Sequence, residues 1–266
     1  MLKDVTLGQF FPGNSFAHKL DPRTKLVMTV FYIAALFCAK NAAGYIAVFL
    51  FLVCAVIFSN TSVKMLVSGL KPVVIILIFT CVLNMIYTRT GTVLVSFWII
   101  TVTTDGVKTA VFMMARIIML IMGTSIMTYT TSPLDLTDGL ERLLAPLKKL
   151  RMPIHEMGMI MSIALRFIPT IIEEADKIIN AQKARGADFE TGGLFKKAKA
   201  MIPILVPLFI SAFRRADELA VAMESRCYHG DNGRTRMKVL KYGARDAFGY
   251  LLCILLLAAV LMLGRI

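Results

Sequence analysis

Long apolar runs alternate with short polar segments along most of this chain. The runs are Leu26–Ala39, Ala42–Phe58, Pro72–Tyr87, Val107–Tyr129 and Ala247–Leu263. A helix needs roughly 20 mostly apolar residues to cross a bilayer. The first run is shorter, so we expect it to include Leu20–Lys25 or to lie where the bilayer is thin. The pattern therefore predicts about five membrane-spanning helices.

Polar residues between the runs mark where elements begin. Asp21-Pro22 predicts a helix start, because aspartate can cap the first turn and proline suits the first helical position. Thr88–Gly106 is polar but encloses the apolar stretch Val93–Ile100 around Trp98. We expect an interfacial hairpin or a partial span there.

The segment Glu141–Arg245 has a different character. It carries 19 Lys and Arg against 11 Asp and Glu, a surplus of eight out of the chain's net charge of +13. Lys and Arg accumulate in the cytoplasmic segments of membrane proteins, so this segment is predicted to be cytoplasmic. The charge does not indicate nucleic-acid binding, since no basic stripe is interleaved with stacking aromatic residues.

Three helices are predicted around this basic segment. Ser132-Pro133 marks the start of the first. Apolar residues at helical spacing predict the second over about Ile154–Ala184, with Gly186 placed to end it. The third is expected after Gly192-Gly193 and should continue to about Tyr228. Both long helices also carry charged residues, so we expect them to pack against the membrane domain with their polar ends in the cytoplasm.

Composition agrees with a membrane protein. Of the 266 residues, 57% are hydrophobic, whereas soluble domains are about 45–50% apolar. We predict an all-α, polytopic helical membrane protein with a cytoplasmic region of long amphipathic helices. The expected domains are an N-terminal membrane domain of about four spans at 1–131, the cytoplasmic region at 132–245 and a C-terminal transmembrane helix at 246–266.

The two long helices end in similar triplets that contain arginine. These are Ala184-Arg185-Gly186 and Ser225-Arg226-Cys227. The planar guanidinium of arginine can make two parallel hydrogen bonds to a carboxylate, so each helix end is a candidate docking point for an acidic groove on a partner protein. The alternative is a solvated cation that the helix macrodipole favours at a C-terminus.

A further arginine, Arg116, lies near the middle of the apolar run Val107–Tyr129. At the centre of a spanning helix, arginine costs at least about 2.5–3.5 kcal/mol. We therefore expect Arg116 to face the bundle interior, a cavity or a partner. A structural bond to backbone carbonyl groups, snorkelling of the side chain toward the membrane surface and a functional role in coupling all remain open.

The sequence offers no pattern typical of catalysis or metal binding. His155 and Glu156 are adjacent, so they point to different helix faces, and no second histidine follows at zinc-site spacing. Thr191-Gly192-Gly193 lacks the Gly-Lys-Ser/Thr of a phosphate-binding loop, so we do not expect the chain itself to hydrolyse nucleotide. We predict no metal, no cofactor and no catalytic residue. An intramembrane enzyme and a self-sufficient secondary transporter are the alternatives from other functional classes.

Several stretches, in order and over most of the chain, resemble the T component of energy-coupling factor (ECF) vitamin and micronutrient transporters. They are His18–Leu26 (HKLDPRTKL), Thr130–Pro133 with Gly139–Glu141, Leu165–Pro169 (LRFIP), Ala181–Gly186 (AQKARG) and Ala222–Tyr228 (AMESRCY). The set is more specific than any one of its members.

The resemblance implies a scaffold in the cell membrane, surrounded by lipid and without an ATPase site of its own. Such a scaffold joins two cytoplasmic ABC-type ATPases to a small substrate-binding membrane protein, the S component. The resemblance also implies coupling helices that end in Ala-Arg-Gly motifs docked in grooves on the ATPases. Ala184-Arg185-Gly186 matches this motif fully, whereas Ser225-Arg226-Cys227 keeps only the arginine. A role that requires glycine in the third position is therefore open at Cys227.

Overall fold

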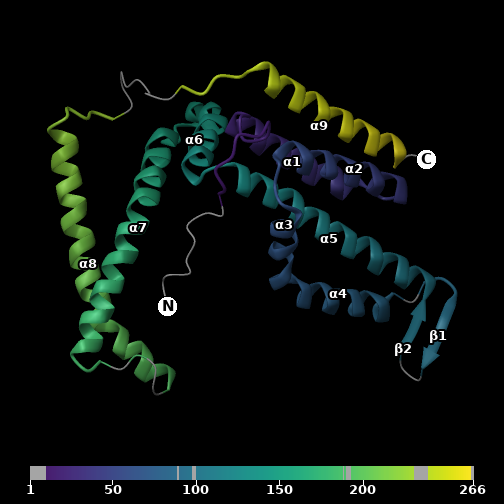
Figure 1. Ribbon diagram of the computed structural model, residues 1–266, viewed down its shortest axis with the longest axis horizontal. Coiled ribbons are helices and arrows are strands. Elements are labelled where there is room, and N and C mark those ends of the chain that lie inside the picture. The colour runs from purple at the N-terminus through teal and green to yellow at the C-terminus, as the bar shows by residue number, and fades with distance from the viewer. Residues whose placement is uncertain are drawn as a thin grey trace. The chain divides into compact units, whose positions relative to one another are not determined.

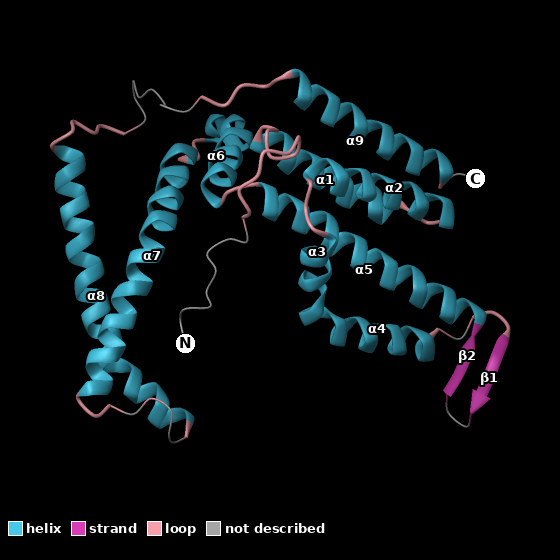
Figure 2. Cartoon of the chain, viewed as in Figure 1, coloured by secondary structure: helices cyan, strands magenta, loops and turns pink. Residues whose placement is uncertain are grey.

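The computed structural model describes residues 10–88, 90–97, 100–187, 189, 193–230 and 239–264, and most of them are helical (Figure 2). They form two compact units. One comprises Gly8–Gly139 with Leu240–Ile266, and we call it the membrane unit; the other is built around Leu140–Val239, and we call it the basic unit. The last helix therefore packs with the first ones, although the whole basic unit separates them in sequence.

Four helices form the core of the membrane unit: α1 (Pro22–Cys38), α2 (Ala42–Ser59), α5 (Thr104–Thr130) and α9 (Ala244–Leu263). Both α9 and α5 pack against α1 and α2 (Figure 1). The side chains of Leu36, Val48, Leu52 and Val260 are almost completely buried in this core. The apolar runs of the sequence thus supply a shared interior as well as surfaces for lipid.

The start of α1 follows the predicted signal. Asp21 is the N-cap, and its carboxylate accepts a hydrogen bond from the Arg23 backbone N–H at 2.9 Å, while Pro22 is the first helical residue. The helix has 17 residues, which corresponds to about 25 Å. That is shorter than the roughly 30 Å hydrocarbon core of a typical bilayer.

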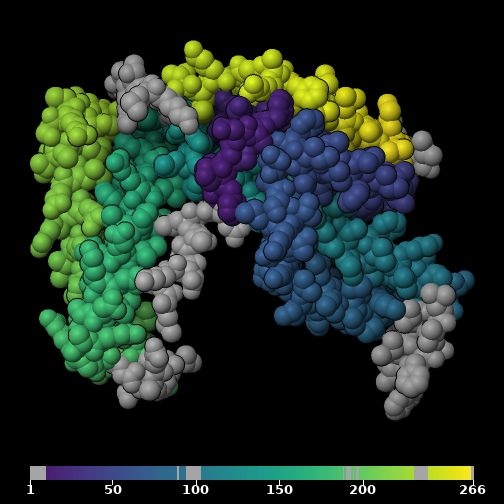
Figure 3. Space-filling model, viewed as in Figure 1, coloured from purple at the N-terminus to yellow at the C-terminus, as the bar shows by residue number. Residues whose placement is uncertain are grey.

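A second layer of the membrane unit consists of α3 (Val63–Leu70), a 3-10 turn (Lys71–Val73) and α4 (Val74–Tyr87). α4 packs along α5 and lies at the surface of the unit (Figure 3). Large apolar side chains cover its outer face, and Ile75 and Phe79 are 78% and 63% exposed. A surface of this kind suits contact with lipid or with another membrane protein.

A short hairpin follows α4. β1 (Val93–Phe97) pairs with β2 (Ile100–Thr103) in antiparallel register, with Val93 opposite Thr103 and Phe97 opposite Ile100. This is the hairpin option of the two expected for Thr88–Gly106; Trp98 lies outside the described residues. Thr103 then caps α5, since its hydroxyl accepts a hydrogen bond from the Gly106 N–H at 3.1 Å.

The basic unit is built mainly from two long helices. α6 (Pro133–Leu144) and a 3-10 segment (Ala145–Leu150) lead into α7 (Ile154–Ala184), and α8 (Leu194–Glu224) follows. α7 has the predicted bounds, whereas α8 ends before the predicted Tyr228. The two helices pack together and run in opposite directions, and α8 is bent along its length (Figure 1). Its interior prolines, Pro203 and Pro207, are a sufficient cause of the bend.

Among the described residues, five helical stretches are long and apolar enough to cross a membrane. They are Ala42–Ser59, Val63–Tyr87, Thr104–Thr130, Ile154–Ala184 and Ala244–Leu263. The predicted number and the helical, multi-pass architecture are confirmed, but the set differs at one member. α1 is too short to qualify, as its apolar run indicated. α7 qualifies in its place, although we expected it outside the membrane, and it is the least apolar of the five.

Candidate functional site

α7 ends in a hydrogen-bonded turn that places Arg185 as its C-cap. Gly186 follows with a left-handed φ of 85°. Its N–H donates to the Lys183 carbonyl at 3.0 Å, and the Ala187 N–H donates to the Gln182 carbonyl at 3.0 Å. These two bonds define a Schellman motif. Because backbone donors satisfy these last carbonyl groups, the Arg185 side chain is not needed for that purpose.

α8 ends in the same motif without a glycine. Cys227 has a left-handed φ of 55°. Its N–H donates to the Glu224 carbonyl at 2.9 Å, and the Tyr228 N–H donates to the Met223 carbonyl at 3.1 Å. Arg226 therefore has the same position relative to these bonds as Arg185 has in α7. The two triplets differ in sequence at two of three positions but have one backbone geometry.

Both arginines lie at the surface of the basic unit. Arg185 and Arg226 are exposed, and neither makes an ion pair or a side-chain hydrogen bond with another described residue. Since α7 and α8 run in opposite directions, their C-terminal ends lie at opposite ends of the helix pair (Figure 1). A helix of 31 residues, the length of each, is about 46 Å long. The unit thus presents two similar cationic helix ends that are far apart.

Glu174 of α7 connects the two long helices. Its Oε2 lies 3.0 Å from Arg215 Nη2, and its Oε1 accepts a hydrogen bond from the Ser211 hydroxyl, both on α8. The Arg215 guanidinium also lies 5.6 Å from the ring centroid of Phe167. The ion pair is about 30% exposed, so water and salt weaken it. It is nevertheless a direct polar link between the two helices.

A second polar contact holds the turn between α6 and α7. His155 Nδ1 lies 2.9 Å from Glu141 Oε1. Gly158 makes room for this carboxylate, because a Cβ there would come within 2.3 Å of Glu141 Oε2. His155 thus pairs with Glu141 rather than with its neighbour Glu156. In the part of the chain that the structure describes, no group of three His, Cys, Asp or Glu residues could hold a metal ion.

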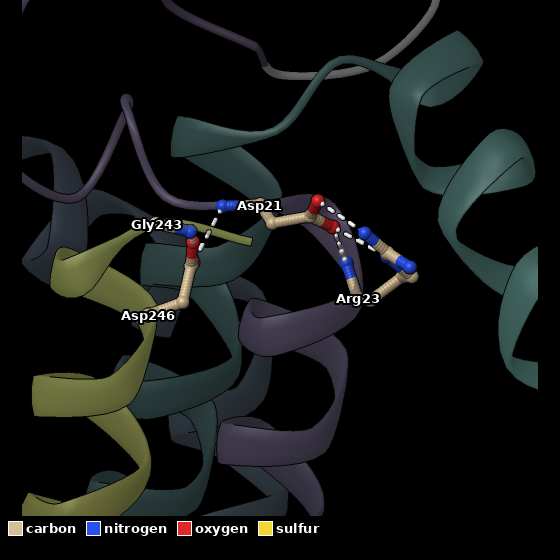
Figure 4. Close-up of polar contacts among 4 residues, drawn as sticks. All are labelled: Asp21, Arg23, Gly243 and Asp246. Atoms are coloured by element: carbon tan, nitrogen blue, oxygen red, sulfur yellow. Dashed lines mark hydrogen bonds and ion pairs between the residues drawn. The ribbon is translucent and has the colours of Figure 1, made fainter. Parts of the chain in front are cut away.

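Sequence reasoning missed a polar clamp in the membrane unit (Figure 4). The buried Asp246 carboxylate accepts one hydrogen bond from the Asp21 N–H and one from the Gly243 N–H, at 2.9 and 2.8 Å. Asp21 in turn pairs with Arg23 at 2.8 Å, and the Arg23 guanidinium lies 3.9 Å from the Tyr242 ring centroid. The clamp ties the start of α1 to the segment that enters α9. Its partners are 225 residues apart, and no local pattern could have related them.

Arg116 lies mid-way along α5, as predicted, and contacts the end of α1. Its Nη2 donates to the Ala39 carbonyl at 3.4 Å. The guanidinium carbon lies 5.7 Å from the ring centroids of both Phe37 and Tyr45. A bond to a backbone carbonyl, one of the alternatives that the sequence left open, is thus present, but it is long.

The membrane unit also contains a cavity of about 550 Å³ among α1, α2, α5 and α9. Of its lining residues only Lys25 is charged, and the Lys25 ammonium donates to the Thr130 carbonyl at 2.8 Å. The cavity therefore offers no pair of acid and base groups for chemistry within the membrane.

Comparison with known proteins identifies the family of this chain. A family model described as cobalt transport protein, CbiQ, matches residues 13–238. A protein of Clostridium kluyveri named energy-coupling factor transporter transmembrane protein EcfT is 50% identical over 267 residues, which cover 100% of this chain and 98% of the relative. This chain belongs to the EcfT family.

Other EcfT proteins are similar over nearly their full length. The one from Ruminiclostridium cellulolyticum is 50% identical over 92% of each chain, and the one from Bacillus subtilis is 42% identical over 100% of each chain. The predicted identity as a T component is therefore confirmed. The chain is a multi-pass membrane protein and a non-catalytic subunit of an ECF transporter complex.

Proposed function

We propose that the basic unit of this EcfT chain transmits motion from two cytoplasmic ABC-type ATPases to a substrate-binding S component in the membrane. One observation carries the proposal. Arg185 and Arg226 have the same position in two Schellman motifs, which lie at opposite ends of the helix pair α7 and α8. Ala184 and Ser225 precede the two arginines, and Gly186 and Cys227 complete the turns. Two matching ends that are far apart suit two separate partners better than one.

Each arginine would enter an acidic groove on one ATPase. A guanidinium fork and a carboxylate form two parallel, charge-assisted hydrogen bonds. If such a pair is buried on docking, removing one partner costs about 2–5 kcal/mol. An exposed pair at the rim of the interface would contribute less than about 1 kcal/mol. The free energy lost on truncation therefore separates a docking arginine from a solvated one.

The link between α7 and α8 would make the pair act as a mechanical unit. When ATP binding brings the two ATPases together, the two helix ends would move with them. The contact of Glu174 with Ser211 and Arg215 would then convert this movement into a shear or rotation of the helices. The membrane unit would respond by tilting or releasing the S component. Vitamins and micronutrients are the substrate classes that the family resemblance suggests.

Charge reversal tests the docking. Arg185→Glu and Arg226→Glu proteins should be co-expressed with the two ATPases and the S component, purified from membranes and assayed for ATP-dependent uptake. We expect each variant to lose bound ATPase and uptake. Arg214→Glu is the matched control, because Arg214 is exposed on α8 but away from its end. A normal yield of complex from both reversals would overturn the proposal.

The same preparations separate coupling from independent transport. The wild-type chain alone in liposomes should not take up substrate when an ion gradient is applied, and it should do so only within the complex with ATP. Uptake by the chain alone would instead identify a secondary transporter.

A further inference from the structure

Arg116 lies where three helix ends of the membrane unit meet. α1 ends at Cys38, α2 begins at Ala42, and the side chain of Asn41 between them donates to the carbonyl of Leu263, the last residue of α9, at 3.2 Å. Lys40 in the same connection is exposed. The end of the membrane unit where these helix ends meet is opposite the end where α1 and α9 begin. Although Arg116 is central in α5, it is therefore level with the polar ends of its neighbours.

Two polar atoms at this position have no hydrogen-bond partner among the described residues. They are Arg116 Nε and the Tyr45 hydroxyl, and both are buried. Tyr45 is only 6% exposed, and its ring lies beside the guanidinium. Buried polar groups are rarely left without a partner. Two such atoms on neighbouring side chains indicate that the described residues do not complete this site by themselves.

No acidic side chain of the membrane unit pairs with this arginine in the part of the chain that the structure describes. The acidic residues of Gly8–Gly139 and Leu240–Ile266 are Asp21, Asp105, Asp135, Asp138 and Asp246. Asp105 is the nearest along α5, eleven residues away, which corresponds to about 16 Å. Asp21 and Asp246 belong to the clamp at the other end of α1. The acidic side chains of the membrane unit therefore supply no counter-charge for Arg116.

We propose that Arg116 and Tyr45 bind the phosphate of a phospholipid headgroup in the leaflet on the side away from the clamp. Phosphates lie at the level where spanning helices end, and aromatic residues are enriched there. Arg116 as a whole residue is half-buried, and a rotation of its side chain would turn the edge formed by the buried Nε and an Nη toward a phosphate, which can accept two parallel hydrogen bonds. The Tyr45 hydroxyl supplies a third donor. This inference is independent of ATPase docking.

Lipid titration of the full chain in detergent tests the site. Native mass spectrometry should count bound dioctanoyl phosphatidylglycerol, with dioctanoyl glycerol and inorganic phosphate as comparison probes. We expect one tight phosphatidylglycerol on the wild-type chain. Arg116→Gln should weaken it about tenfold or more, and Tyr45→Phe about two- to tenfold. Lys40→Gln is the matched control and should change the affinity less than about twofold.

The outcomes separate the sources of the anion. Equal binding of dioctanoyl glycerol, equal competition by inorganic phosphate, or unchanged affinity in Arg116→Gln and Tyr45→Phe would each overturn the lipid site. Loss of the S component from Arg116→Gln with lipid affinity unchanged would also overturn it and assign the acidic group to a membrane partner. Should Arg116→Gln fail to fold, Tyr45→Phe, which keeps the buried ring, decides the question.

Discussion

Gly186 and Cys227 have the same left-handed backbone conformation, each directly after the arginine that follows a long helix. Their φ angles are 85° and 55°, and each N–H donates to the carbonyl three residues earlier. Glycine adopts this conformation freely, whereas a residue with a Cβ loses roughly 1–2 kcal/mol. The hydrogen bonds of the turn thus hold Arg226 in position, although Cys227 is unfavourable in the left-handed conformation.

Replacing Cys227 with glycine should therefore stabilise the end of α8. We expect Cys227→Gly to increase local stability by about 1 kcal/mol, seen as slower hydrogen exchange of the Cys227 and Tyr228 amides. Gly186→Ala should have the opposite effect at the end of α7. Cys227→Ala is the control, because it removes the thiol but keeps the Cβ. If Cys227→Gly and Cys227→Ala exchange at the same rate, the backbone conformation is not the cause.

The Glu174–Arg215 pair should contribute to the packing of α7 on α8. For this partly exposed pair we expect a coupling energy of about 0.5–1 kcal/mol. A double-mutant cycle of Glu174→Ala, Arg215→Ala and the double variant measures it from thermal unfolding in detergent. The coupling energy should decrease at high salt, because the two charged groups are accessible to ions. A coupling energy of zero at low salt would mean that the apolar contacts alone hold the crossing.

The clamp at the buried Asp246 carboxylate should contribute substantially to the stability of the membrane unit. Asp246→Ala leaves the Asp21 and Gly243 N–H groups without an acceptor, and we expect a loss of about 2–4 kcal/mol in unfolding free energy. Asp246→Asn keeps one acceptor oxygen and should lose less. Chemical unfolding in detergent measures the loss of unfolding free energy for both variants. Arg245→Ala is the control, because Arg245 is the exposed neighbour of Asp246. A loss no greater than that of the control would show that water replaces the carboxylate without cost.

The helices and the arginine ends follow from local signals, so the sequence predicts them well. Apolar spacing places α7 at Ile154–Ala184, and Asp21-Pro22 places the start of α1. The equivalence of Cys227 to Gly186 could not be predicted, because residue preference disfavours a left-handed cysteine. The hydrogen bonds of the turn, which outweigh that preference, are visible only in the fold.

Contacts between distant segments could not be predicted from the sequence for a different reason. The bond from the Asp21 N–H to Asp246 joins residues 225 positions apart, and no periodicity encodes such a pairing. The depth of Arg116 was likewise ambiguous. Its place within one apolar run puts it at the centre of a span, but the ends of α1, α2 and α9 put it near a boundary.

The stoichiometry of ATPases on single charge-reversal variants tests the account most directly. Complexes of the wild type, Arg185→Glu, Arg226→Glu and the double variant should be purified without ATP and weighed by native mass spectrometry. If each arginine docks one ATPase, we expect two, one, one and no bound ATPase subunits, and the two single variants should each lose a different one. Two ATPases on every variant would contradict the account, and so would loss of the same subunit from both single variants.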